Sequence, residues 1–96
     1  MIKMDQVEFM SNIKDMETQI MEEVTDAQKY MLCADHWKSD PSIANTYMTI
    51  AKQEIEHAKN INEIMSSLKN LSDDQKVIVK FLIDMNNDQI RRVSNK

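Results

Sequence analysis

The most constraining feature of this sequence is that its 96 residues include no glycine. Glycine is the residue that most readily adopts the left-handed backbone of tight turns, so a chain without it has few easy places to reverse direction. Tight β-hairpins depend on such residues, whereas long helices need few turns. The missing glycine therefore favours an all-α fold made of a few long helices.

Three helices are predicted, over about residues 5–37, 41–71 and 73–93. No linker long enough to separate domains is visible, so we expect a single helical domain over residues 1–96. Because only about three residues join the first two helices, these should be antiparallel neighbours in a helical hairpin.

Two local signals support the predicted helix starts. Asp40 can cap the second helix, and Pro41 suits a first helical position. Ser72 and Gln75 have the spacing of a capping box, which places the start of the third helix there.

Composition excludes several classes of protein. Charged residues make up 29% of the chain, and no apolar run approaches the roughly 20 residues that span a bilayer. No signal peptide is visible, and the single cysteine, Cys33, cannot form an internal disulfide, so we expect a cytoplasmic protein. The net charge of −4, without a basic stripe, argues against a nucleic-acid partner. A hairpin this small buries a modest core, so self-association is expected.

The first two helices each carry a seam of apolar residues spaced three and four apart, which is typical of a face packed against partner helices. The first seam comprises Ile13, Met16, Ile20, Glu23, Ala27, Tyr30, Ala34 and Trp37. The second comprises Ile43, Tyr47, Ile50, Glu54, His57, Ile61, Ile64 and Leu68. Only Glu23 interrupts the first seam with a charge, and only Glu54 and His57 interrupt the second.

These three interruptions are expected at one level of the hairpin. Glu23 lies about 15 residues before the turn, and Glu54 and His57 lie about 15 residues after it. Buried charges need a compensating partner. One interpretation is a salt-bridged layer with protonated His57. The other, which we favour, is a metal ion, because one histidine does not balance two carboxylates and the pairing of two hairpins doubles the deficit. Carboxylate oxygens with one imidazole suit iron, manganese or zinc.

The same residues resemble the ferritin-like di-iron carboxylate superfamily. Residues 54–57, Glu-Ile-Glu-His, resemble its Glu-x-x-His motif. Glu23, seven residues before Tyr30, resembles the first-helix ligand and tyrosine of ferritins and rubrerythrins. The resemblance covers roughly residues 13–68, the first half of a ferritin-like four-helix bundle.

The resemblance implies that one chain holds half of a di-iron site. The complete site takes a Glu from each of two helices and a Glu-x-x-His motif from each of the other two. The predicted third helix has neither Glu nor His. The second set would come from another copy, as in encapsulated ferritin, so that Glu23, Glu54 and His57 of both chains bind the metals in a homodimer or a higher homo-oligomer.

The implied function is a ferroxidase that oxidises Fe(II) with oxygen or peroxide. Tyr30 is a candidate hydrogen-bond donor to a metal ligand, or a core aromatic residue. A metal-stabilised or metal-free helical dimer with a structural or regulatory role remains the alternative, and a peroxidase related to rubrerythrin is a third. There is no four-cysteine rubredoxin segment, and the C-terminal residues 91–96 do not resemble a cargo tag for an encapsulating shell.

The predicted third helix has an apolar stripe in its first half: Val77, Ile78, Phe81, Leu82 and Met85. Its second half is polar apart from Ile90 and Val93. We expect this helix to cover the hairpin or to extend a subunit interface.

Overall fold

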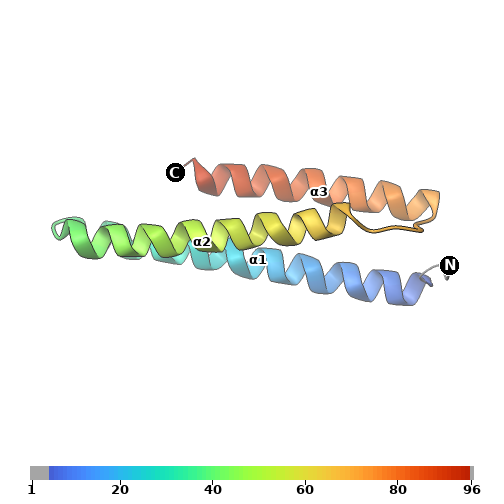
Figure 1. Ribbon diagram of the computed structural model, residues 1–96, viewed down its shortest axis with the longest axis horizontal. Coiled ribbons are helices and arrows are strands. Elements are labelled where there is room, and N and C mark those ends of the chain that lie inside the picture. The colour runs from blue at the N-terminus through green and yellow to red at the C-terminus, as the bar shows by residue number, and fades with distance from the viewer. Residues whose placement is uncertain (1–4, 96) are drawn as a thin grey trace.

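The computed structural model describes residues 5–95 and is all-helical over that part of the chain. The three helices are α1 (Gln6–His36), α2 (Pro41–Ser66) and α3 (Asp73–Ser94). They lie side by side in an elongated bundle with extents of 56 × 18 × 16 Å (Figure 1). The predicted all-α class is confirmed, and residues 1–4 and 96 of the expected domain lie outside the described part.

α1 and α2 form the predicted antiparallel hairpin (Figure 1). The Asp5 side chain caps α1 by accepting a hydrogen bond from the backbone N–H of Glu8 at 2.8 Å. Asp40 caps α2 in the same way, accepting from the N–H of Ile43 at 3.4 Å, and Pro41 is the first helical residue. These caps keep the connection short, so residues equally distant from the turn face each other.

α2 ends at Ser66, five residues before the predicted end at 71. The following segment instead contains Asn70 with a φ of 61°, a left-handed conformation that asparagine tolerates better than most residues. Leu68 and Leu71 still pack against the core from this loop. Their apolar character continues the helical spacing of α2 in the sequence, which explains why the predicted end of the helix lies five residues too far along the chain.

α3 packs along the hairpin and runs parallel to α1. Gln75 Nε2 donates a hydrogen bond to Gln6 Oε1 at 3.1 Å, and Asn86 Nδ2 donates to Glu17 Oε1 at 2.5 Å. Both pairs are separated by 69 residues, which defines a parallel register. The predicted capping box is present at Ser72 and Gln75. α3 runs past the middle of the hairpin but ends short of the turn, so the turn end has no third helix beside it (Figure 1).

The buried side of α2 differs from its predicted seam. The residues withdrawn from solvent are Ala51, Ile55, Ala58, Asn62 and Met65. Members of the predicted seam are half-buried, and His57 and Ile64 are exposed. The reason is that α2 contacts both α1 and α3, so its most buried side faces both helices. The seam lies beside that buried side, where the described part of the chain supplies no further helix.

The apolar stripe predicted for α3 divides between two sides of the helix. Ile78 and Leu82 pack against the core, whereas Val77 and Phe81 are exposed. In the second half, Asn86 is buried together with Ile90 and Val93. The polar residue is tolerated there because it hydrogen-bonds to neighbouring helices. The prediction that α3 covers the hairpin is therefore confirmed in part. Of the predicted stripe, Ile78 and Leu82 provide this contact.

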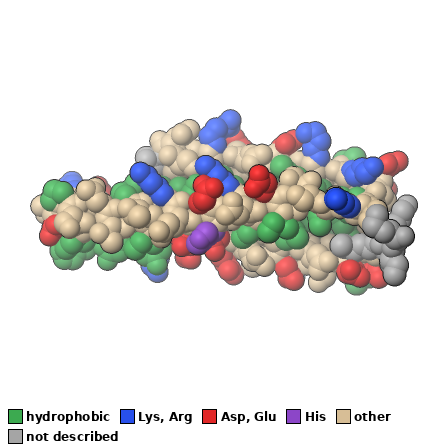
Figure 2. All heavy atoms as spheres, viewed as in Figure 1, with side chains coloured by type: hydrophobic (Ala, Val, Ile, Leu, Met, Phe, Trp, Pro, Cys, Tyr) green, Lys and Arg blue, Asp and Glu red, His purple; other side chains and the backbone are tan. Residues whose placement is uncertain are grey.

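The molecular surface mixes both signs of charge. On the face shown in Figure 2, acidic and basic side chains are interspersed along the molecule, and hydrophobic side chains reach the surface near the turn end of the hairpin. None of the helices in the described part has the length and apolar character needed to cross a membrane.

Candidate metal centre

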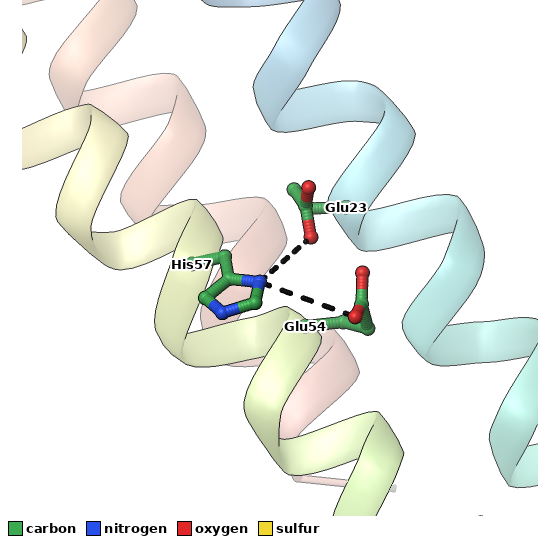
Figure 3. Close-up of side chains that lie close together, drawn as sticks. All are labelled: Glu23, Glu54 and His57. Carbon is green, nitrogen blue, oxygen red and sulfur yellow. Dashed lines mark hydrogen bonds and ion pairs between the residues drawn. The ribbon is translucent and has the colours of Figure 1, made fainter.

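The three predicted ligands meet in space. Glu23 projects from α1, and Glu54 and His57 project from α2 (Figure 3). One ligand atom from each residue lies within 4.8 Å of the other two. His57 Nδ1 lies 3.3 Å from Glu23 Oε2 and 4.0 Å from Glu54 Oε1. The level deduced by counting residues from the turn is thus the level at which these side chains converge.

Small residues beside the ligands let the helices approach each other at this level. Ala27 follows Glu23 by one turn of α1, and Ala51 and Ala58 flank Glu54 by about one turn of α2 on either side. All three alanines have no exposed surface. The distance between two packed helices depends on the side chains at their contact, so alanine brings the backbones close. This feature was not predicted from the sequence, although alanine at these positions was its signal.

The two carboxylates are withdrawn from solvent, whereas the imidazole lies at the rim. The exposed fraction of the side chain is 25% for Glu23, 19% for Glu54 and 58% for His57. Figure 3 shows Nδ1 of the imidazole turned toward the carboxylates and its other nitrogen turned away. The ion pairs found for these carboxylates in residues 5–95 both involve His57. Two acids thus share a single weak base.

The crowding of acids changes the protonation of Glu54. A hydrogen bond with Glu23, partial burial and the nearby charge of Glu23 all raise the pKa of Glu54, and the charge of His57 opposes them. The proximity of the two acids therefore favours the protonated form of Glu54, and a bound cation would relieve the same repulsion between the carboxylates.

The family model of the rubrerythrins matches residues 14–89, which is most of the chain and includes Glu23, Glu54 and His57. The chain belongs to the rubrerythrin family. Comparison with curated proteins and with solved structures gave no match. Rubrerythrins are ferritin-like helical proteins, which agrees with the three-helix architecture and with the resemblance seen in the sequence.

Iron is the metal that the rubrerythrin family implies, and the donor set fits it. Two carboxylates and one imidazole nitrogen are donors that iron accepts, as do manganese and zinc. Among the described residues of this rubrerythrin-family chain, no fourth carboxylate or imidazole joins these three donors. A metal ion held by them would keep further coordination positions for other ligands.

Two tyrosines accompany the site on its side toward the turn. Tyr30 follows Glu23 by seven residues and Tyr47 precedes Glu54 by seven, which is about two helical turns in each case. Their rings stack with centroids 6.3 Å apart and planes at 22°. The Lys29 Nζ atom lies 5.5 Å from the centroid of the Tyr30 ring. The hydrogen bond from Tyr30 to a ligand stays a prediction, whereas the stack with Tyr47 was not anticipated.

Other acidic residues near the motif lie outside the group. Glu56 is exposed, two residues from Glu54 and thus on another side of α2. Glu22 is also exposed, next to Glu23 on α1. Glu56 therefore provides a matched control for tests of Glu54.

Proposed function

We propose that two copies of this chain pair through the side of the hairpin that carries Glu23, Glu54 and His57, and that the pair binds two iron ions. The observation that supports this most directly is the convergence of three donor atoms within 4.8 Å on a side that α3 leaves open. Each chain supplies half of the ligand set that ferritin-like sites use.

Charge balance favours two copies around two ions. The paired site holds four carboxylates, Glu23 and Glu54 from each chain, and two neutral imidazoles. Four negative charges match the four positive charges of two Fe(II) ions. In a single chain, the two carboxylates and His57 give one ion too few ligands and leave the half-buried group facing water.

The side chains around the group suit burial between two copies. Tyr30, Tyr47, Ile50 and Ile61 are half-buried in the single chain, and Ile64 is 56% exposed. Covering these residues would remove apolar surface from water and surround the carboxylates with a drier medium, which strengthens their attraction for cations.

The proposed activity is oxidation of Fe(II) by oxygen or peroxide. Iron bound there supplies the electrons that reduce the oxidant. The contribution of the chain is to hold the substrate ions with Glu23 and Glu54 and to compensate their charge. Glu54, whose pKa is raised by the neighbouring Glu23, would bind the cation in its ionised form, and His57 offers Nδ1 while its other nitrogen remains turned outward.

The decisive experiment is anaerobic titration with Fe(II), followed by measurement of oxygen consumption. We expect saturation near one iron per chain, followed by oxygen uptake on aeration. Glu54→Ala should abolish both, whereas the neighbouring Glu56→Ala should leave both intact. Equal losses in the two variants, or saturation far below one iron per chain, would contradict the proposal.

The contact of His57 with Glu23 supports a second candidate function. At 3.3 Å, protonated His57 forms an ion pair with Glu23, so the group can exist as a polar layer of a structural or regulatory helical dimer. This dimer would be metal-stabilised or metal-free and would not catalyse the oxidation of Fe(II). Failure to consume oxygen after stoichiometric Fe(II) binding would favour this candidate over a ferroxidase.

A further inference from the structure

The outer side of α3 carries exposed apolar residues. Val77 and Phe81 are 68% and 66% exposed, and Met85, one turn after Phe81, is also exposed. Ile78 and Leu82 of the same helix pack against the core, so the exposed residues point away from the hairpin. Large apolar side chains clustered on an uncovered helix side are typical of an interaction surface.

Two charged residues of opposite sign bound this surface. Asp74 precedes Phe81 by seven residues, and Arg92 follows Met85 by seven. Asp74 and Arg92 are 18 residues apart, about five helical turns, so they lie on the same side of α3. Both are exposed. Asp74, Phe81, Met85 and Arg92 together are called the α3 surface below.

The spacing of these four residues is symmetric about position 83 of α3. Phe81 and Met85 lie two residues to either side of it, and Asp74 and Arg92 lie nine residues to either side. A two-fold axis perpendicular to the helix at this position brings a second α3 into antiparallel contact. Phe81 then faces the partner's Met85, and Asp74 faces the partner's Arg92. The surface is therefore complementary to itself in both apolar character and charge.

We propose that the α3 surface is a second self-association surface, occupied by the α3 helix of another copy in antiparallel orientation. The charge pattern specifies this orientation, since a parallel pairing would place Asp74 against Asp74 and Arg92 against Arg92. At the small crossing angle of about 20° common in helical bundles, the charged ends stay within reach of each other.

α1 extends the surface. Met10 and Met21 are exposed residues seven before and four after Glu17, the α1 residue that bonds to Asn86 of α3. They therefore lie on the side of α1 nearest α3. Methionine adapts its shape to a partner, which suits an interface edge.

The α3 surface lies on α3, whereas the candidate metal centre lies on α1 and α2, so one chain can use both surfaces at once. Copies paired through the metal centre would then join further copies through α3 and form assemblies larger than a dimer. A contact made mainly by one helix pair is small, so we expect it to dissociate before the larger pairing. The pairing of two α3 helices does not itself require iron, whereas assemblies larger than a dimer also rest on the proposed pairing through the metal centre.

In-chain contacts leave the charged residues available. Arg92 forms an ion pair with Asp88 at 2.9 Å, four residues earlier on the same helix. The guanidinium group has five N–H donors, so it can bind Asp88 and the partner's Asp74 together. An exposed ion pair of this kind contributes little to stability. Sharing Arg92 between Asp88 and the partner's Asp74 therefore costs little free energy.

The first test measures the mass of the full-length protein in solution by light scattering over a range of concentrations. We expect the wild type to form assemblies larger than a dimer and Phe81→Glu to reduce them to dimers, with the iron bound per chain unchanged. Leu32→Glu replaces an equally exposed residue, at 62%, beyond the end of α3 and should keep the wild-type mass. An unchanged mass for Phe81→Glu, or a wild type that never exceeds a dimer held by the metal-site side, would overturn the proposal.

The second test uses charge reversal, which leaves the packing of α3 on the hairpin untouched. Asp74→Arg alone and Arg92→Asp alone each bring like charges together and should weaken the assembly at low ionic strength. The double variant restores opposite charges at both ends and should recover it. A double variant as dissociated as the single variants would show that Asp74 does not face the partner's Arg92, and the antiparallel arrangement would be wrong.

Discussion

His57 on α2 and Glu23 on α1 are separated by 34 residues in the sequence, and their Nδ1 and Oε2 atoms lie 3.3 Å apart. The contact joins the two arms of the hairpin midway along their length. The carboxylate of Glu23 also lies close to Glu54, and this proximity raises the pKa of Glu54. The two carboxylates therefore repel each other when both are ionised, and under the proposed function the three side chains would bind a cation, which leads to distinct expectations for stability.

Replacement of Glu23 by glutamine should affect the metal-free and the metal-bound protein differently. Without metal, Glu23→Gln removes one of two crowded carboxylates, so the melting temperature should stay the same or rise. With Fe(II), the wild type should gain about 2.7 kcal/mol at a hundredfold excess over the dissociation constant, and the variant should gain less. Thermal melting of both proteins with and without Fe(II) measures this. A metal-insensitive wild type and a destabilised metal-free variant would instead indicate a structural polar layer.

The stability of the metal-free protein should depend on pH through Glu54. Its pKa is raised above the ordinary 4.5 in the folded chain, so the folded state holds this proton more tightly than the unfolded state does. The resulting stabilisation is present at low pH and is lost as the pH rises through the raised pKa. Glu54→Gln cannot ionise, so it should become more stable relative to the wild type as the pH increases above 4.5. Denaturant unfolding of both proteins at several pH values measures the difference, and a constant difference would contradict the assignment.

A charge placed on the open side of the hairpin should separate the two copies. Ile64 lies seven residues after His57, on the same side of α2, and is 56% exposed in the single chain. Ile64→Glu should therefore leave the helix content unchanged, lower the mass in solution, and reduce iron binding because half of each ligand set is lost. Leu32→Glu is the control, since Leu32 lies nine residues after Glu23 and thus on the opposite side of α1. Full iron binding by a monomeric Ile64→Glu protein would show that one chain suffices for the site.

Loss of the Asn86 amide should destabilise the packing of α3. Its Nδ2 donates to Glu17 Oε1 at 2.5 Å and to Asn62 Oδ1 at 3.1 Å, and the residue is wholly buried. Asn86→Leu keeps a similar volume but leaves Glu17 and Asn62 without this donor, so we expect a loss of about 1–3 kcal/mol. Chemical denaturation measures it, with Lys76→Leu at an exposed position of α3 for comparison. A stability equal to that of the wild type would mean that water satisfies both groups.

The convergence of three polar side chains at one level of the hairpin could be predicted because helices are regular. Asp40 and Pro41 fix the end of the turn, and the constant rise per residue then sets the level of Glu23, Glu54 and His57. Local hydrogen bonds at the caps use neighbouring residues, so their sequence pattern carries the information needed.

The placement of α3 could not be predicted in the same way. Burial of Asn86 depends on Glu17 and Asn62, whose positions relative to α3 follow only from the assembled structure. The loop after α2 contains Asn70, a residue that tolerates either a helix or a left-handed turn. Such choices are decided by tertiary contacts, for which neighbouring residues give no signal.

The parallel register of α1 and α3 has a consequence for the order of folding. Every contact in this register closes a loop of about 69 residues, as the Gln6–Gln75 and Glu17–Asn86 pairs do. Contacts between α1 and α2 near the turn close much shorter loops, which cost less chain entropy and form sooner. We therefore expect the contacts between α1 and α2 to form first near the turn and then as far as the level of Glu23 and His57, before α3 packs against the hairpin. The half-site would then exist in a folding intermediate in which the third helix is still solvent-exposed, and pulsed hydrogen exchange would detect it as early protection in α1 and α2.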